Sequence, residues 1–351
     1  DKENENGSVK KPGSSIRSDE QVVFFTTVGR LNKAGTAWVI PIHGWIYEPE
    51  KDNVLQQKAL SVLAETLGVE PGTEEAEHFT ERAGLFVADN EWLKKISVRI
   101  GDRYHTLSRS GRNGHFRGAV ELDPAEAEHL APSGVLPFTA VTDEKDPRLF
   151  TGRALLVEPE GLSVISDIDD TIKDSHVTNK KRLLRKTFLE EFETIDGMAE
   201  VYRRWVRRDG AQIHFVSSSP WQLYPPLRTM TRSAGFPTAS WNLKDFRLKD
   251  ASLLNLFADP LETKPAVIEP LLSIFPKRKF VLVGDSGEKD PEIYGRLARV
   301  YGDQILAVYI RDVTASGKKR YEEAFAGVPE DKWMVFHIAE QLPQSLRELL
   351  P

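Results

Sequence analysis

The sequence contains no cysteine, no long apolar run and no excess of positive charge. The absence of cysteine excludes disulfide bonds, thiolate catalysis and cysteine-ligated zinc. No segment approaches the roughly 20 apolar residues that a membrane-spanning helix needs, so we expect any membrane contact to be peripheral. The formal net charge is −6, so no overall basic field indicates nucleic acid as a partner.

What is present indicates a soluble globular protein. With 351 residues, 28% of them charged and 40% hydrophobic, the chain is long enough for two domains with separate cores. The first residue is Asp1 rather than Met. This start is consistent with a trimmed cytoplasmic protein or with an exported protein whose signal segment has been removed, so the compartment stays open.

Three stretches of different pattern follow one another along the chain. Residues 1–20 are polar without periodicity, which predicts a disordered tail. Residues 21–159 carry short β-branched and aromatic runs separated by turn residues, which predict a mostly β, sandwich-like accessory domain with a helical insertion. In residues 160–351 strands alternate with helices, which predicts an α/β domain with a parallel sheet and helices on both faces, ending in a helix over residues 339–350.

The most informative stretch is the apolar run of residues 162–166, which leads directly into Asp167, Asp169 and Asp170. Clustered carboxylates repel one another and are unfavourable at the end of a buried strand. A metal ion or a developing charge would explain them. An acidic turn around a purely structural cation is the alternative interpretation.

Two further predicted strands of this half also end in polar residues. The strand over residues 212–217 ends in three serines, Ser217 to Ser219, before Pro220 at a predicted helix start, which is a natural anion site. Simple helix capping by Ser219 is the alternative. The strand over residues 279–283 leads to Asp285 and, five residues later, Asp290. Because parallel strands end at the same edge of a sheet, these acids could share a cation with Asp167.

Lys264 opens a predicted helix over residues 264–275. A cation there opposes the helix dipole, so its position is mildly unfavourable unless it neutralises a phosphate or a carboxylate. A solvated surface lysine is the alternative. Three histidines of the β region, His43, His105 and His115, lack the spacing of metal ligands, and we interpret them as structural or surface residues.

Taken in order, these residues resemble the four motifs of the haloacid dehalogenase (HAD) superfamily. The stretch Asp167-x-Asp169-x-Thr171 is similar to motif I, Ser217 to motif II, Lys264 to motif III, and Gly284-Asp285 with Asp290 to motif IV. Within that superfamily, residues 161–313 resemble the Mg²⁺-dependent phosphatidate phosphatase family first known from an actin-patch protein. Asp170 replaces the Gly usual in HAD enzymes but agrees with this narrower family.

The resemblance implies a phosphomonoesterase that forms an aspartyl-phosphate, with phosphatidate as the expected substrate. Asp167 would be the nucleophile, Asp169 the acid and base, Ser217 a hydrogen-bond donor to phosphate, and Lys264 a fixed cation. Mg²⁺ would be held by Asp167, the Asp169 carbonyl and Asp285, while Asp290 would orient the metal shell. A HAD phosphatase for a soluble phosphomonoester, and a non-enzymatic lipid- or protein-binding module on a HAD scaffold, are the alternatives.

A basic run, Lys180 to Lys186, lies between the first two motifs beside apolar residues. Such a run could contact an anionic bilayer while a lipid headgroup enters the site, which would make an anionic phospholipid both substrate and partner. An amphipathic helix with solvated charges explains the pattern equally well.

Overall fold

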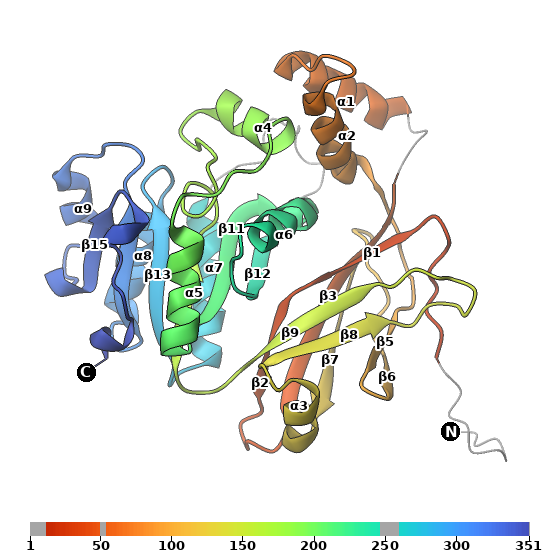
Figure 1. The fold of residues 1–351 in the computed structure, drawn as a ribbon, viewed down its shortest axis with the longest axis horizontal. Helices are drawn as coiled ribbons and strands as arrows, with labels where there is room; N and C mark the ends of the chain where they lie inside the picture. Colours follow the sequence, from red (N-terminus) through yellow and green to blue (C-terminus); the bar gives the residue numbers. More distant parts are fainter. Residues whose placement is uncertain (1–11, 50–53, 246–259, 351) are drawn as a thin grey trace. The chain divides into compact units, whose positions relative to one another are not determined.

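The structure is a computed structural model that describes residues 12–49, 54–245 and 260–350 (Figure 1). The chain divides into two compact units. The first unit combines Asp1–Glu50 with Ala88–Val157, and the second combines Lys51–Val87 with Glu158–Pro351. The helical segment predicted as an excursion of the β domain is therefore counted with the second unit.

The first unit is built on one nine-stranded sheet. Its strands are β1 (Gln21–Phe25), β2 (Thr27–Leu31), β3 (Trp38–Glu48), β4 (Asp89–Asn90), β5 (Ser97–Ile100), β6 (Arg103–Thr106), β7 (His115–Leu122), β8 (Val135–Ala140) and β9 (Thr151–Val157). A short helix, α3 (Pro124–Leu130), follows β7. The main strand order is β1-β3-β2-β9-β8-β5-β6, with β4 and β7 both paired to β3. The prediction of a mostly β region is confirmed.

This sheet curls around a single apolar core. Phe24 of β1 lies edge-on to Phe138 of β8, with ring centroids 5.1 Å apart, although three strands separate β1 from β8 in the sheet. Neighbouring strands are about 4.8 Å apart, so a flat sheet could not bring these rings together. Ser14 and Ser15, predicted as part of the tail, donate backbone hydrogen bonds to the carbonyls of Val141 and Lys95.

The second unit contains a six-stranded parallel sheet. Its strands are β10 (Leu162–Ser166), β11 (Gln212–Pro220), β12 (Ala239–Lys244), β13 (Lys279–Asp285), β14 (Ile305–Arg311) and β15 (Trp333–Phe336). Numbered within the sheet, the order β12-β11-β10-β13-β14-β15 reads 3-2-1-4-5-6, which is a doubly wound arrangement. All five residues of β10 are buried, as expected for a central strand covered on both faces. The predicted α/β class is confirmed.

Helices cover both faces of this sheet (Figure 1). They are α5 (Met198–Asp209), α6 (Tyr224–Ser233), α7 (Pro260–Ile274), α8 (Asp290–Val300) and α9 (Lys318–Ala324). The predicted C-terminal helix over residues 339–350 is wrong: the structure has only short 3-10 turns at Ala339–Gln341 and Arg347–Leu349. Pro343 lies between them, and proline interrupts a helix because it lacks the backbone N–H and clashes with the preceding turn.

Three helices of the second unit form a separate cluster: α1 (Val54–Leu67), α2 (Glu74–Val87) and α4 (Lys180–Phe188). Phe188 packs against Phe79 and Phe86, with ring centroids 6.5 and 5.6 Å away. Arg82 donates to the Thr187 carbonyl at 3.1 Å, and His78 contacts the Leu189 carbonyl at 2.8 Å. We call α1, α2 and α4 the helical cluster. Within the described ranges, no helix combines the length and the apolar character that crossing a membrane requires.

Candidate active site

The candidate site lies at the carboxyl ends of β10, β11 and β13. Strand β10 pairs with β11 on one side and with β13 on the other, so the chain changes direction across the sheet at this point. In doubly wound sheets ligands bind at such a switch point. Asp167 follows β10 directly, Ser217 lies in the last part of β11, and Asp285 ends β13. The predicted motif residues are therefore brought together by the topology of the sheet.

Lys264 lies fully buried among carboxylates. Its Nζ is 2.8 Å from Asp167 Oδ1 and 2.5 Å from Asp290 Oδ1. A third carboxylate, Glu288, approaches it at 3.1 Å. Helix α7 begins at Pro260, so the prediction that Lys264 opens the helix is wrong by about one turn. The three acids around Lys264 stabilise its charge at this position. Lys264 is 1% exposed, which excludes the alternative of a solvated surface lysine.

Asp167, Asp285 and Asp290 form the one group of carboxylates among the described residues whose geometry could hold a metal ion, with oxygens within 4.8 Å of one another. All three are buried. Asp285 Oδ1 accepts from the Gly287 N–H at 2.5 Å, whereas its buried Oδ2 has no hydrogen-bond partner within the described ranges. An orphaned carboxylate oxygen beside two other acids fits a hard divalent cation such as Mg²⁺.

Burial and mutual repulsion disfavour the ionised forms of Asp167 and Asp285. Burial raises the pKa of Asp167 well above its ordinary value; the charge of Lys264 opposes this, and Asp290 adds to it. Burial likewise raises the pKa of Asp285, with Asp290 and Asp167 adding to the effect. A bound cation would favour the ionised form of each carboxyl. Gly284 permits the close packing here, because a Cβ at that position would lie 2.3 Å from Asp290 Oδ2.

Asp169 has hydrogen-bond donors on both of its oxygens. Oδ2 accepts from the hydroxyls of Ser219 at 2.8 Å and Ser217 at 3.3 Å. Oδ1 accepts from Ser175 at 2.7 Å and from Lys173 at 3.3 Å. Burial by itself would raise the pKa of Asp169, but the charge of Lys173 and the hydroxyls of Ser175 and Ser219 outweigh it and lower the pKa.

The serine segment lies close to its prediction. Strand β11 continues through Pro220, and a 3-10 helix, Trp221–Leu223, begins at the next residue and leads into α6 at Tyr224, so the predicted helix start at Pro220 is one residue early. The Ser219 hydroxyl consequently does not cap a helix but contacts Asp169. Ser217 Oγ accepts the Ser219 N–H at 2.9 Å, which keeps the two side chains on the same carboxylate.

Sequence reasoning missed three residues that contact the site: Lys173, Ser175 and Glu288. Lys173 and Ser175 follow motif I closely, and Glu288 lies within motif IV, so proximity to a motif was the available signal. Asp170 has a left-handed φ of 55°, a conformation that favours Gly and that Asp also adopts. Its carboxylate accepts the backbone N–H groups of residues 175, 176 and 177 at 2.7–2.9 Å, which fixes the loop carrying Ser175.

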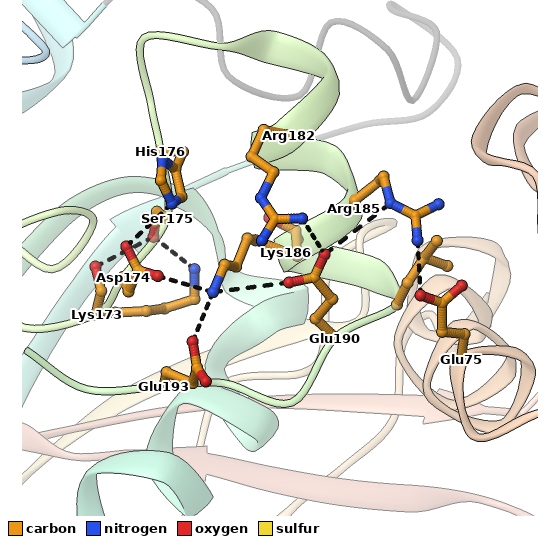
Figure 2. Close-up of polar contacts among 12 residues, drawn as sticks. Glu75, Lys173, Asp174, Ser175, His176, Arg182, Arg185, Lys186, Glu190 and Glu193 are labelled. Carbon is orange, nitrogen blue, oxygen red and sulfur yellow. Dashed lines mark hydrogen bonds and ion pairs between the residues drawn. The ribbon is translucent and has the colours of Figure 1, made fainter.

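The basic run of α4 is engaged in ion pairs (Figure 2). Arg185 contacts Glu75 at 2.6 Å, and Arg182 contacts Glu190 at 2.7 Å. Lys186 is buried and lies 2.7 Å from Asp174 and 2.6 Å from Glu193. Lys180 and Lys181 are exposed. At least three of the five cations therefore bind acids of the same unit. These three are neither freely solvated, as the amphipathic-helix interpretation expects, nor available to an anionic bilayer.

In the first unit, two histidines that are distant in the sequence contact each other. His43 of β3 and His115 of β7 have ring nitrogens 2.8 Å from each other, because β3 and β7 are neighbouring antiparallel strands. Burial lowers the pKa of His43 well below its ordinary value. The pairing of distant strands, which spacing along the chain cannot reveal, produces this contact.

Comparison with known proteins agrees with the motifs. Residues 162–312 match the family described as phosphatidate phosphatase APP1, catalytic domain. The family resemblance is confirmed. Phosphatidate phosphatase APP1 of Saccharomyces cerevisiae is 36% identical over 176 residues, which are 49% of this chain and 30% of that protein. The uncharacterized protein C29B5.04c of Schizosaccharomyces pombe is 32% identical over 178 residues, 50% of this chain and 29% of that protein.

The matches cover a limited part of each protein. This chain aligns with less than a third of the length of either relative, and the family match leaves out the β unit and the helices α1 and α2. Among solved structures, a putative β-phosphoglucomutase from Thermotoga maritima aligns over 51% of this chain and 95% of its own, at 14% identity and a TM-score of 0.31. At that score the likeness adds nothing to the fold described above.

Proposed function

We propose that the second unit is a phosphomonoesterase that transfers a phosphoryl group to Asp167 and then to water. The observation that carries this proposal is the buried set of Asp167, Asp285, Asp290 and Lys264 at the switch point of the sheet, inside the segment that matches the phosphatase family. Asp167 lies in one carboxylate group with Asp285 and Asp290 and pairs with Lys264 as a fixed cation. With a divalent cation bound, such a set could bind a phosphate ester and stabilise charge during its transfer.

In the first step, an oxygen of Asp167 attacks phosphorus while the bond from phosphorus to the ester oxygen breaks. Lys264 offsets negative charge on Asp167 and on the phosphoryl oxygens. The Ser217 hydroxyl donates a hydrogen bond to one of those oxygens. Asp169 donates a proton to the leaving alkoxide, which yields the free alcohol.

The first step requires a protonated Asp169, although the surrounding donors favour its carboxylate form. A phosphate monoester has a second pKa of about 6, so its monoanion can bring the proton with it. In the second step, the carboxylate of Asp169 takes a proton from water, which attacks phosphorus and releases Asp167 and inorganic phosphate. The lowered pKa of Asp169 suits this second role.

The expected cofactor is Mg²⁺. Asp167, Asp285 and Asp290 are the side chains that would hold it or its water shell, and the Asp169 carbonyl remains a predicted further ligand. When bound, Mg²⁺ would supply positive charge that favours ionised carboxylates and a polarised phosphate.

We propose phosphatidate as the substrate, with diacylglycerol and phosphate as products. Support comes from the name of the Saccharomyces cerevisiae relative and from the family match. An anionic phospholipid would then be the partner and contact with the membrane would be peripheral, whether the protein is cytoplasmic or exported. Because Arg182, Arg185 and Lys186 are paired, the support for a lipid does not come from the basic run.

The test is phosphate release by the purified protein with Mg²⁺, on short-chain phosphatidate micelles beside a panel of soluble phosphomonoesters. We expect phosphatidate to have the highest kcat/KM. A higher kcat/KM for a sugar phosphate or a nucleotide would replace the lipid with a soluble substrate. No release from any ester, with metal bound and the fold intact, would leave a non-enzymatic binding module as the function.

A further inference from the structure

Lys173 is a fully buried cation that none of the four motifs accounts for. Its side chain is 2% exposed, and its Nζ lies 2.6 Å from the Ser175 hydroxyl and 3.3 Å from Asp169 Oδ1. Ser175 in turn donates to the same Oδ1 at 2.7 Å. Burying an ammonium group is costly unless charge and hydrogen bonds compensate it. Among the described residues, Asp169 is the one carboxylate partner of Lys173. The charge of Lys173 is therefore stabilised mainly by Asp169, the residue predicted to act as acid and base.

The surroundings keep Lys173 in place. The ring of Phe192 lies under its ammonium, with the centroid 4.8 Å from Nζ. The guanidinium of Arg82, from α2, lies 4.0 Å from the same centroid. The backbone on either side of Lys173 is also fixed, because its neighbours Ile172 and Asp174 form hydrogen bonds with Ile195 and Glu193. The lysine therefore has little freedom to leave Asp169.

We propose that Lys173 is a positioning residue for Asp169. This inference rests on the proposed phosphatase function and deepens it. Lys173 and Ser175 together occupy Oδ1 of Asp169, so the carboxylate keeps one orientation. The other oxygen, Oδ2, then faces Ser217 and Ser219 at the end of β11, where the phosphate ester is expected to bind. Loss of Lys173 would let the carboxylate rotate and would leave proton transfer misaligned.

A neighbouring lysine provides a matched comparison. Lys186 is also buried in this unit and contacts carboxylates, but its partners are Asp174, Glu190 and Glu193, none of which contacts the phosphate site in the described structure. Figure 2 shows the two lysines in the same view, with Lys173 beside Ser175 and Lys186 among the acids. If burial and ion pairing alone mattered, substituting either lysine would have the same consequences.

The experiment compares leaving groups. General acid catalysis matters for an alkyl ester such as short-chain phosphatidate, whose alcohol leaves poorly, and much less for p-nitrophenyl phosphate, whose phenolate leaves readily. Misplacing a catalytic group costs about 10²-fold. We expect Lys173→Met to lower kcat/KM about 10²-fold on short-chain phosphatidate and no more than about 5-fold on p-nitrophenyl phosphate. Lys186→Met should leave the ratio of the two substrates unchanged.

Ser175→Ala tests the same role independently, in case Lys173→Met does not fold. It removes only the hydroxyl that bridges Lys173 and Asp169, and we expect a smaller loss, again confined to the alkyl ester. Equal losses on both substrates, or no loss, in folded Lys173→Met and Ser175→Ala would overturn the positioning role. Absence of turnover by the unsubstituted protein on both esters would overturn the proposed function, and this inference with it.

Discussion

Two clusters of ion-paired side chains in the second unit differ in how many acids each has for every cation. The site cluster consists of Lys264 with Asp167, Asp285, Glu288 and Asp290: four acids and one cation, all but Glu288 fully buried. The rim cluster joins three cations to four acids at the edge of the helical cluster. Its members are Arg182, Arg185, Lys186, Glu75, Asp174, Glu190 and Glu193.

We interpret this difference as one between the candidate functional site and a structural cluster. In the site cluster, burial raises the pKa of Asp167 and of Asp285, because one lysine does not compensate the acids. In the rim cluster, burial by itself would raise the pKa of Asp174, but the hydrogen bond and charge of Lys186 outweigh it and lower that pKa. In the site cluster, buried acids without sufficient positive charge indicate a candidate place for a cation. Within the described residues, the compensated acids of the rim cluster contact no part of this site, and we interpret them as stabilising.

The largest expected effect comes from removing either of the two acids assigned to the reaction. Asp167→Asn and Asp169→Asn should each reduce turnover by about 10⁴-fold or more, because the nucleophile or the acid and base would be lost. Asp167→Asn should not lower the free energy of unfolding of the metal-free protein, since it relieves repulsion among buried acids. The measurements are phosphate release and thermal unfolding.

The matched control in the rim cluster is Glu193→Gln. Its carboxylate contacts Lys186 at 2.6 Å and is 66% exposed, so turnover should be kept. Substantial activity of Asp167→Asn with metal bound would contradict the aspartyl-phosphate mechanism and would also remove the distinction between the two clusters.

Metal removal should act on the site cluster alone. Excess chelator should abolish turnover and lower the midpoint of thermal unfolding, and added Mg²⁺ should restore both. Ca²⁺ should substitute poorly, because it takes more ligands and could engage both oxygens of Asp167. Full activity in excess chelator would show that Lys264 alone supplies the positive charge.

The site was largely predictable from the sequence because its signals are local. An apolar strand followed by acids, and the order of four motifs, identified Asp167, Ser217, Lys264 and Asp285 without knowledge of the contacts. Parallel strands end at one edge, so residues that follow strands converge there. Their chemical roles stay predictions.

What the sequence could not provide depends on pairing between distant segments. Helices α1 and α2 lie before most of the β unit in the chain, yet Arg82 and Glu75 contact residues of the loop and helix after motif I. The basic run was ambiguous for the same reason, because its acidic partners include Glu75, more than 100 residues away. Lys173 gave no periodic or spacing signal that distinguished it from a surface lysine.

A moderate effect is expected from Lys186→Met. This substitution leaves Asp174 and Glu193 without their cation. Lys186 is buried, but the two acids are 31% and 66% exposed and are screened by water, so we expect a cost of about 1 kcal/mol and a fall of about 2–4 °C in the unfolding midpoint. Lys181→Gln, at an exposed position of the same helix, should change stability by less than about 0.5 kcal/mol. Equal stability of the two variants would mean that the rim cluster does not stabilise the fold.

Membrane binding gives an expected difference of similar size. If an anionic lipid contacts α4, Lys180→Gln with Lys181→Gln should weaken binding to anionic vesicles by about 1 kcal/mol per residue at low salt, and less as salt rises. Turnover of a soluble ester should stay the same, since both side chains are exposed. Unchanged vesicle binding would assign the whole basic run to the rim cluster. The comparison needs phosphatidate-containing and neutral vesicles in parallel.

The smallest effect is the pH dependence of the rim cluster. Lys186 lowers the pKa of Asp174, so between that lowered value and the ordinary value of 3.8 the unfolded chain binds more protons than the folded one. The stabilisation is therefore fully present above about pH 4 and is lost as the pH falls through the folded pKa of Asp174. We expect the difference in unfolding free energy between the unsubstituted protein and Lys186→Met to be constant from about pH 5 to 8 and to shrink below pH 4. Urea unfolding at several pH values measures this difference. A difference that instead grew on acidification would mean that Lys186 does not stabilise the ionised form of Asp174, and the rim cluster would lose its role as the compensated counterpart of the site.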